Sequence, residues 1–319
     1  MCYSAQVQQA YDEYLQQFGA NIDFEAFAHL YGARLVNNKI KTPKAMDAQF
    51  RHPKRAGEAD IQASIEAYRL QQTAYLEQEL FKQVQRLADA QRTLETKSTK
   101  AATESRRIAT DKIKWVKAKL LDLNRIELKD SDSRIYPGTY TPVMVLENGV
   151  RVVKPMRYQC RPTGKPAQYD TKYPGTYNAR MDNLDGFWRA QFGRTHGIML
   201  VRAFYEHVLR QKRRPDGAAD GDQQENVILE FKPCSGQEML VACLWSRWTG
   251  PGEDELYSFA AITDVPPPEV AAAGHDRCII PIKPEHVDAW LNPDPTNLAA
   301  LYAILNDRER PYFEHRWVA

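Results

Sequence analysis

The chain has 319 residues, of which 43% are hydrophobic and 26% charged, and its formal net charge is +2. These values are typical of a globular protein that buries a large core in one domain or two. No apolar run has the length of a membrane span and the N-terminus lacks a secretion-signal pattern, so we expect a cytoplasmic protein without membrane contact. The small net charge neither indicates nor excludes a nucleic-acid partner, because such binding needs only a local basic surface.

The cysteine content argues against structural crosslinks. There are five cysteines, an odd number, and none of them has CxxC spacing, which disfavours both a disulfide framework and a zinc site. We expect free thiols in a reducing compartment, no metal and no other cofactor. The cysteines are Cys2, Cys160, Cys234, Cys243 and Cys278.

The first two residues, Met1 and Cys2, offer a chemistry that no internal position has. Cysteine is small enough for an initiator methionine to be removed ahead of it, which leaves an amine and a thiol on adjacent carbons. The α-amine has a reference pKa of about 7.7 to 8.0, so much of it is neutral and nucleophilic near neutral pH. Such an aminothiol condenses with an aldehyde to an imine, and the thiol then closes a thiazolidine ring. The alternative is that Cys2 follows the start codon without any function.

Two helical regions are predicted in the first part of the chain. The segment from Ser4 to Gly19 predicts a helix with Ser4 as its N-cap and Gly19 at its end. From Glu58 to Tyr136 there is no glycine or proline, and apolar residues recur at helical spacing. The resulting stripe consists of Ile61, Ile65, Tyr68, Tyr75, Leu76, Leu80, Val84 and Leu87.

A polar turn at residues 97–103 and a second apolar series after it predict a helical hairpin. We assign the hairpin to residues 59–125, as an insertion into a domain formed by residues 1–58 and 126–319. The second arm carries basic residues that either contact a phosphate backbone or form a solvated face, and the hairpin as a whole could bind a protein partner. These basic residues are Arg106, Arg107, Lys112, Lys114, Lys117 and Lys119.

The period of the sequence changes after the hairpin. Short β-branched or aromatic segments bounded by Gly, Pro or Asp predict strands, for example in residues 140–156, 197–208, 226–233, 238–248, 257–263 and 277–282. Residues 284–305 return to a helical pattern. We therefore predict an α+β fold, with a strand-rich barrel or sandwich, peripheral helices and the inserted hairpin.

Several short segments match one family in order along the chain. They are MCYSA at the start, YNAR at residues 177–180, AFYEHV at 203–208 and GHDRCIIPI at 274–282, with LVACLWSRW at 240–248 and AWLNP at 289–293. Together they resemble the SRAP family, the SOS response-associated peptidases, over residues 1 to 36 and 126 to 295. The resemblance implies an SRAP-like domain whose N-terminal cysteine crosslinks to abasic sites in single-stranded DNA.

The resemblance also implies a role for particular residues. Cys2 matches the cysteine that forms the thiazolidine with the ring-opened sugar, and Asn178 matches the asparagine that helps to hold it. Arg180 matches a phosphate contact, and Glu206 and His275 match the family's catalytic glutamate and histidine. The chain departs from the family pattern at three places: Tyr3 and Ser4 stand in place of Gly-Arg, His207 in place of a tryptophan, and Cys278-Ile279 in place of Met-Pro.

Each of these residues also has a physical interpretation. Desolvation in an aromatic strand would raise the pKa of Glu206 into a range useful for proton transfer, whereas an edge position would leave it in solvent. His275, in a polar turn before a strand, could protonate the sugar oxygen or serve only the structure. Asn178 could be a turn residue and Arg180 a solvated charge.

Four aromatic residues could stack on bases or belong to the core. They are Tyr177, Phe204, Tyr205 and Trp245.

The sequence thus predicts an enzyme of the DNA-damage response that processes abasic sites in single-stranded DNA through Cys2. Two alternatives remain open. One is a cysteine peptidase of limited activity or one that removes only its own first residue, with Cys2, Glu206 and His275 as the working groups. The other is a non-catalytic interaction protein that binds a partner through the hairpin.

Overall fold

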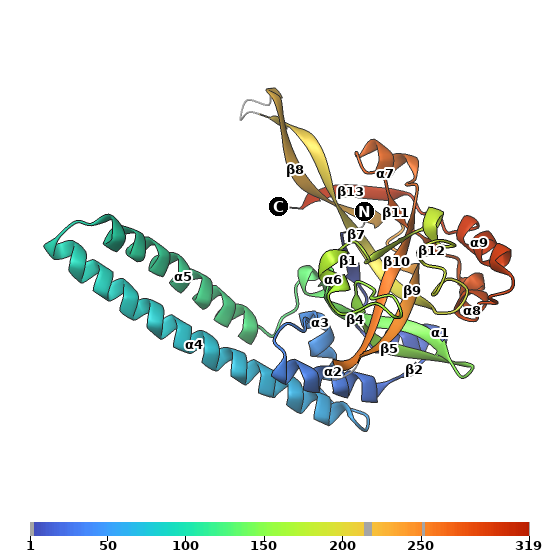
Figure 1. Ribbon diagram of the computed structural model, residues 1–319, viewed down its shortest axis with the longest axis horizontal. Helices are drawn as coiled ribbons and strands as arrows, with labels where there is room; N and C mark the ends of the chain where they lie inside the picture. Colours follow the sequence, from blue (N-terminus) through green and yellow to red (C-terminus); the bar gives the residue numbers. More distant parts are fainter. Residues whose placement is uncertain (1–2, 214–218, 251–252, 319) are drawn as a thin grey trace.

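A computed structural model describes residues 3–213, 219–250 and 253–318 and confirms the predicted α+β fold (Figure 1). The helices of the described part are α1 (Tyr11–Phe18), α2 (Phe24–Val36), α3 (Lys44–Asp47), α4 (Glu58–Thr96), α5 (Lys100–Asn124), α6 (Tyr169–Lys172), α7 (Pro268–Ala272), α8 (Val287–Leu291) and α9 (Leu298–Asn306). The strands of the described part are β1 (Ser4–Val7), β2 (Asn21–Ile22), β3 (Arg134–Ile135), β4 (Tyr140–Glu147), β5 (Val150–Tyr158), β6 (Asn178–Arg180), β7 (His196–Arg213), β8 (Ala219–Pro233), β9 (Met239–Gly250), β10 (Glu253–Asp264), β11 (Cys278–Ile279), β12 (Pro281–Ile282) and β13 (Phe313–Val318).

Five strands close into a barrel. β4 pairs with β5, β5 with β10, β10 with β9, β9 with β7, and β7 returns to β4. Only the pairing of β5 with β10 is parallel, and the turn between β4 and β5 is made by Asn148 and Gly149 with positive φ. Closure leaves these strands with a neighbour on both sides, and it separates an inner face from an outer one.

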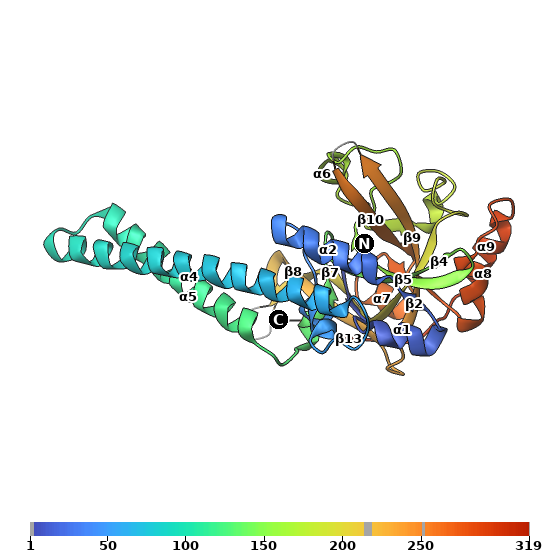
Figure 2. The ribbon, with the colours of Figure 1, turned by 90° about the horizontal axis from the view of Figure 1, so that it is seen from below.

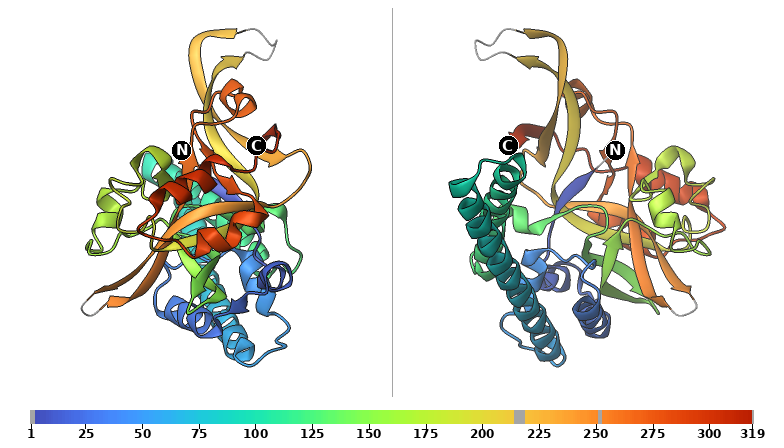
Figure 3. Two further views of the ribbon diagram at one scale, coloured as in Figure 1. Left: turned by 90° about the vertical axis from the view of Figure 1, so that its right-hand side faces the viewer. Right: turned by 60° about the vertical axis from the view of Figure 1, so that its left-hand side comes forward.

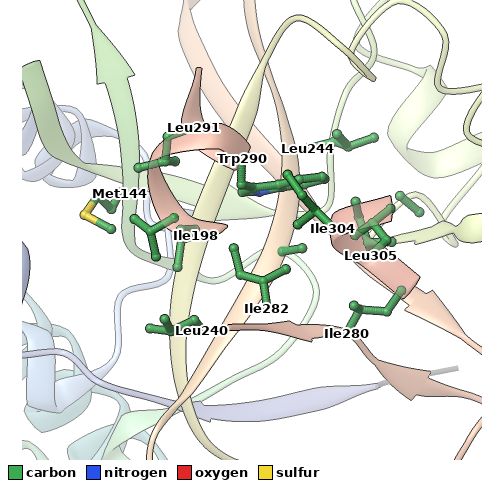
Figure 4. Close-up of a cluster of buried hydrophobic side chains, with 14 of the residues drawn as sticks. Met144, Ile198, Leu240, Leu244, Ile280, Ile282, Trp290, Leu291, Ile304 and Leu305 are labelled. Atoms are coloured by element: carbon green, nitrogen blue, oxygen red, sulfur yellow. The ribbon is translucent and has the colours of Figure 1, made fainter. Parts of the chain in front are cut away.

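Apolar side chains fill both faces of the barrel. The inner cluster contains Val143, Met156, Val241 and Phe259, each fully buried. On the outer face, α8 and α9 cover the sheet with a second cluster, whose labelled members surround Trp290 (Figure 4). Alternation of inward and outward residues along one strand produces both clusters, as in Cys243 inside and Leu244 outside. The barrel is therefore a packed scaffold, which can hold side chains at its ends in fixed positions.

The N-terminal segment differs from the sequence prediction. A helix from Ser4 was wrong: residues Ser4–Val7 form β1, and the helix α1 begins only at Tyr11. β1 lies between β7 and β3, with Ser4 opposite Tyr205 in β7. Pairing with strands far along the chain, and complete burial of alternate side chains, override the local helical preference here. Gly19 ends α1 in the left-handed conformation (φ 60°), as expected.

The predicted pair of long helices is present as α4 and α5. They leave the body side by side and extend far beyond it (Figures 1 and 2). The predicted stripe is covered only in part: Ile61 and Leu76 are buried, whereas Tyr75 and Val84 are 61% and 48% exposed. At its base α4 packs on α2, and Ile61 belongs to a third apolar cluster together with Phe27. Whether residues 59–125 form a separate domain stays a prediction.

The strands β7 and β8 continue past the barrel as a long hairpin, and β13 adds to the free edge of β8 (Figure 3). Strands were predicted from the sequence at 197–208 and 226–233; the structure continues β7 to Arg213 and begins β8 at Ala219. The strand β13 was not predicted from the sequence. None of the described helices combines the length and the apolar character that crossing a lipid bilayer requires.

Candidate functional site

Glu206 and His275 meet at one end of the barrel. Glu206 lies in the part of β7 that extends beyond β1, and its side chain is fully buried. His275 Nε2 lies 3.0 Å from Glu206 Oε2, and the imidazole is 8% exposed. Burial is the largest influence on Glu206 and raises the pKa of its carboxyl above the ordinary value, although the neighbouring histidine counteracts part of the rise. The carboxyl and the imidazole thus lie within hydrogen-bond distance, a geometry in which a proton can pass between them.

The loop before β11 brings His275 to β7. Gly274 has a φ of 97°, and a Cβ atom there would lie 2.8 Å from Val208 Cγ1 in β7. Glycine is required for both reasons, since a side chain would be strained by the backbone conformation and would meet Val208. The close approach of this loop to β7 is what allows the imidazole to reach Glu206.

The backbone of Arg277 can satisfy either neutral tautomer of His275. His275 Nδ1 lies 2.9 Å from the Arg277 carbonyl oxygen, and the Arg277 N–H donates to the same nitrogen at 3.2 Å. When Glu206 holds the proton it donates to Nε2, and Nδ1–H donates to the carbonyl; transfer of the proton to Nε2 gives an imidazolium, whose Nδ1–H keeps the same acceptor. A proton can therefore move between the carboxyl and the imidazole without leaving a ring nitrogen unsatisfied.

Asn178 forms a second polar group with aromatic neighbours. It lies in the short strand β6 and is 6% exposed, and the Tyr158 hydroxyl lies 3.5 Å from its Oδ1. Tyr158 in turn packs edge-on against Tyr177, at 5.6 Å between ring centroids, and stacks on Phe259 at 5.3 Å. These contacts fix the amide in one position, which a turn residue in solvent would not need.

Strand β10 connects the two groups. β6 pairs with one edge of β10, with Asn178 opposite Ala261, and β11 pairs with the other edge at Thr263. Neighbouring strands lie about 4.7 to 4.9 Å apart, so β6 and β11 are about 10 Å apart across the end of β10. Asn178 and His275 therefore approach the same end of the barrel from two sides.

Arg180 is exposed at the surface beside this group. Its Nε donates to Asp182 Oδ1 at 3.0 Å, and a second contact joins Nη2 to Oδ2. The side chain is 48% exposed, so that the ion pair is screened by water and a phosphate could compete with Asp182 for the guanidinium. Its predicted role as a phosphate contact stays a prediction.

The remaining aromatic candidates are mainly packed. Phe204 is fully buried and Tyr205 is 5% exposed, so neither ring presents a free face. The indole N–H of Trp245 donates to the His196 carbonyl at 3.1 Å, and its half-buried ring lies 6.1 Å from Tyr257. Tyr257 lines a different cleft, beneath α2, so the structure does not group Trp245 with the other candidates.

Cys2 lies outside the described residues. The four cysteines that the structure describes are all free, and three of them are buried: Cys160, Cys243 and Cys278. Burial raises the pKa of each of these thiols, that of Cys160 to about 12, which keeps them protonated and unreactive. Within the described ranges, no three His, Cys, Asp or Glu side chains lie close enough together to hold a metal ion.

The sequence analysis missed a cluster beside the N-terminal strand. The ring of Tyr3 packs edge-on against His207 at 4.9 Å and against Tyr136 at 5.8 Å. Arg134 donates from Nε and Nη2 to the Ser4 hydroxyl at 3.0 and 2.8 Å, and its guanidinium lies 3.6 Å over the Tyr205 ring. The signal in the sequence was the departure from the family pattern at positions 3, 4 and 207, because the altered residues contact one another or a shared neighbour.

The fold and the site define an α+β protein with a closed barrel, whose N-terminal strand runs beside a buried carboxylate and histidine. The sequence model of one family, described as SOS response associated peptidase (SRAP), matches residues 91–319. The chain belongs to this SRAP family, which associates it with the response to DNA damage. The matched part begins within α4. Strand β1 lies before it in the sequence but pairs with β7, which belongs to the matched part.

Solved structures with a related chain trace include structural-genomics targets. A protein of Bordetella bronchiseptica is 17% identical, with a TM-score of 0.44, and the match covers 59% of this chain and 87% of that chain. A protein of Bacteroides thetaiotaomicron is 14% identical, with a TM-score of 0.44 and coverages of 58% and 77%. A phage-related protein of Bordetella bronchiseptica is 19% identical, with a TM-score of 0.42 and coverages of 58% and 80%. A search of the curated proteins found no match.

Proposed function

We propose that this protein forms a covalent thiazolidine crosslink between Cys2 and the ring-opened sugar of an abasic site in single-stranded DNA. The observation that carries the proposal is the buried contact between Glu206, on the strand next to β1, and His275, 3.0 Å away in the loop before β11. Tyr3, the neighbour of Cys2 in the chain, packs against His207, which follows Glu206 directly. Tyr3 and the proton-transfer pair thus lie in neighbouring segments, which supports an amine–aldehyde condensation at Cys2.

The reaction balances without a cofactor. The α-amine of Cys2 adds to the aldehyde carbon of the open sugar, and the resulting carbinolamine loses one water to give an imine. The thiol sulfur then bonds to the imine carbon, and the proton of the thiol goes to the nitrogen. The product is a five-membered ring in which the protein and the DNA are joined with loss of one water.

Glu206 and His275 would supply the proton transfers. Loss of water from the carbinolamine needs a proton on the departing hydroxyl, and burial, which raises the pKa of the Glu206 carboxyl, favours the protonated form that can donate it. His275 can return the proton to Glu206 through the contact between Nε2 and Oε2. Asn178 would hold the N-terminal residue, and Arg180 would bind a phosphate of the strand.

Intact-mass spectrometry with an abasic single strand tests the proposal. We expect mature protein to lack Met1, and the adduct to equal the masses of protein and oligonucleotide minus one water. Cys2→Ala should give no heat-stable adduct. Cys2→Ser keeps the amine but closes the ring poorly, so that it should give an imine that only borohydride makes permanent. A stable adduct with Cys2→Ala, or retention of Met1 in crosslinking protein, would overturn the proposal.

A cysteine peptidase is the second candidate, because the family description names that activity. The same residues would act, with the Cys2 thiol as nucleophile and the pair of Glu206 and His275 moving protons. Peptide turnover that is independent of DNA, and that is lost in Cys2→Ala, would favour this function. Removal of Met1 in a Glu206→Ala variant would show that the first residue is not trimmed by the site itself.

A further inference from the structure

Helix α4 carries a second apolar row that α5 does not cover. Its positions follow one another at alternating spacings of four and three, which is the heptad pattern of a helix that packs on another helix. The three large members Leu70, Phe81 and Val84 are 60%, 73% and 48% exposed. We call these eight positions the outer row: Ala63, Ala67, Leu70, Ala74, Glu77, Phe81, Val84 and Ala88.

The outer row and the contact with α5 occupy different faces of α4. The residues of α4 buried on the α5 side are Leu76, Gln83 and Ala90, which are seven residues apart. Each residue advances about 100° around a helix axis, so that Leu70 and Phe81 lie roughly 120° and 140° away from Leu76. A helix with one neighbour needs only one apolar face. The outer row is thus an additional apolar face without a partner in the described chain.

The body of the protein leaves the outer row accessible. At its base α4 packs on α2, and Ile61 and Ile65 belong to the apolar cluster there. Each of them is two residues from Ala63, about 200° around the axis, and therefore lies on the opposite side of the helix. Beyond the base, α4 and α5 extend away from the body together (Figures 1 and 2). A further helix can therefore lie along the whole outer row without meeting α2.

The surface beside the outer row carries almost no charge. On the side away from α5 it is flanked by Ser64, Gln71, Gln78 and Gln85, again seven residues apart. Of these twelve positions only Glu77 is charged, whereas the other fourteen residues of 63–88 include five charged ones. Loss of charge around exposed apolar side chains is typical of the core of a protein interface and not of a solvated helix.

We propose that the outer row packs antiparallel against the outer row of a second copy of this chain, so that two hairpins form a four-helix assembly. The row is self-complementary in this direction, because all eight positions find a partner in a single register. This register pairs Ala74 of one copy with Glu77 of the other, Leu70 with Phe81, Ala67 with Val84 and Ala63 with Ala88. The pairing involves no residue of the barrel end and does not rest on the proposed function.

Charge selects this register over its neighbours. The flanking residues that meet are neutral, Gln71 opposite Gln78 and Ser64 opposite Gln85. A shift by one heptad leaves two positions of the row unpaired in each copy and brings a carboxylate onto it. In one direction Asp60 meets Val84, and in the other Glu95 meets Ala63. A charge opposite an apolar residue in such a seam is costly, which disfavours both shifted registers.

The contact has the size of a reversible dimer. The outer row and both of its flanks provide four positions in each heptad, or about 15 residues of each copy over 63–88. Since about 20 to 30 residues bury about 800 Å² on each partner, the assembly would bury about 1,000 Å² in total, which is near the lower limit of a specific interface. The two Ile61 residues would lie about 44 Å apart along the helix axis, so that the two bodies occupy opposite ends.

Sedimentation equilibrium of the full chain between about 1 and 300 µM tests the inference. The parent should change from one chain to two with concentration. Leu70→Glu and Phe81→Glu should stay single chains, because each places a carboxylate in two layers of the assembly. Tyr75→Glu is the matched control and should dimerise as the parent does, since Tyr75 is 61% exposed on the same helix but lies outside the outer row.

Circular dichroism shows whether each variant keeps its helices. A parent that remains a single chain over the whole range overturns the inference. Equal loss of the dimer in a folded Tyr75→Glu protein also overturns it, because the contact would then lie on another face of the hairpin.

Two further variants test the antiparallel pairing. Glu77→Leu should tighten the dimer about ten-fold or more, because it replaces the single charge of the row by an apolar group in two layers. In a Cys2→Ala, Cys234→Ala background, a mixture of Ala63→Cys and Ala88→Cys proteins should be joined by a short bis-maleimide, whereas neither protein alone should be. A weaker Glu77→Leu dimer, or crosslinking of one cysteine variant with itself, would contradict the proposed register.

Discussion

The barrel end and the helical hairpin both contain charged and large apolar residues, but they differ in how far these side chains are buried. At the barrel end, charged groups such as Glu206 are fully buried and contact a specific partner, His275. On the hairpin, charged groups lie in solvent in short-range pairs, for example Arg107 with Glu104, and large apolar residues such as Phe81 are 73% exposed. Burial changes the chemistry of a carboxyl group, whereas exposure leaves it as a solubilising charge. The proposed reaction therefore uses buried groups of the barrel end, and a contact of the hairpin with DNA or protein stays a prediction.

The largest expected effect separates the two regions by stability. Trp290→Ala should destabilise the barrel by about 3 to 5 kcal/mol, because the ring is fully buried and its N–H donates to the Gly197 carbonyl at 3.0 Å. Leu76→Ala in the hairpin should cost less, because only one neighbouring helix covers that side chain. Urea unfolding followed by tryptophan fluorescence measures both. Equal losses would show that the hairpin and the barrel unfold as one cooperative unit.

Glu206→Gln should reduce the crosslinking rate about 10²- to 10⁴-fold, the usual contribution of a general acid. The same variant should be at least as stable as the parent at pH 7. Since the pKa of Glu206 is raised in the fold, the folded state binds the proton more tightly than the unfolded state, and stability falls as pH rises from 4.5 through the raised value. The amide has no such dependence, so that its advantage should vanish below pH 4.5.

Thermal unfolding at several pH values, together with crosslinking rates, checks this prediction. His275→Gln is a useful comparison, because it leaves the carboxyl buried and should not relieve the pH dependence. A Glu206→Gln protein that is less stable than the parent at pH 7 but equal to it in acid would mean that the ion pair with His275 outweighs burial.

Shortening the hairpin should leave the chemistry intact. Replacing Thr73 through Leu120 by a Gly-Ser linker keeps the hydrogen bond between Arg69 and Asn124, which joins the two helices at the base. Crosslinking of short oligonucleotides should stay within about two-fold of the parent rate, as expected for substitutions that are distant from a site. A deletion that begins at Asp60 should instead destabilise the protein, because it removes the buried Ile61.

Affinities of the shortened protein for long and short single-stranded oligonucleotides then test whether the hairpin binds DNA. If its basic second arm extends the DNA contact, the shortened protein should lose affinity only for long single-stranded oligonucleotides. Equal affinity at all lengths would assign the arm to solvent or to a protein partner. Loss of crosslinking with short oligonucleotides would show that the reaction needs the hairpin as well as the barrel.

The smallest expected effect concerns Arg180. Arg180→Ala should lower the slope of log affinity against log salt by about one unit or less, because Asp182 already neutralises part of its charge. Asp182→Asn should have the opposite effect and strengthen binding. Affinities measured between 50 and 200 mM salt, as is usual for such slopes, check both variants. An unchanged slope in a folded Arg180→Ala protein would mean that this arginine contacts no phosphate.

Local patterns in the sequence determined much of this fold. The β-branched residues of 140–156 predicted strand structure, which the protein forms as β4 and β5, and the absence of Gly and Pro from Glu58 to Tyr136 predicted α4 and α5. The spacing of apolar residues determines these elements, and that spacing is a local property of each segment. The candidates Glu206 and His275 also came from the sequence, through the order of its short motifs.

The pairing of the elements and the contacts between their side chains could be learned only from the tertiary structure. Ser4 to Val7 became a strand because β7 and β3 offer pairing partners on both sides, which no local pattern contains. The contact between Glu206 and His275 depends on Gly274 lying against β7. Distances and desolvation arise only when residues far apart in the chain are packed together, because a strand's register and a carboxyl's pKa are properties of its neighbours in space.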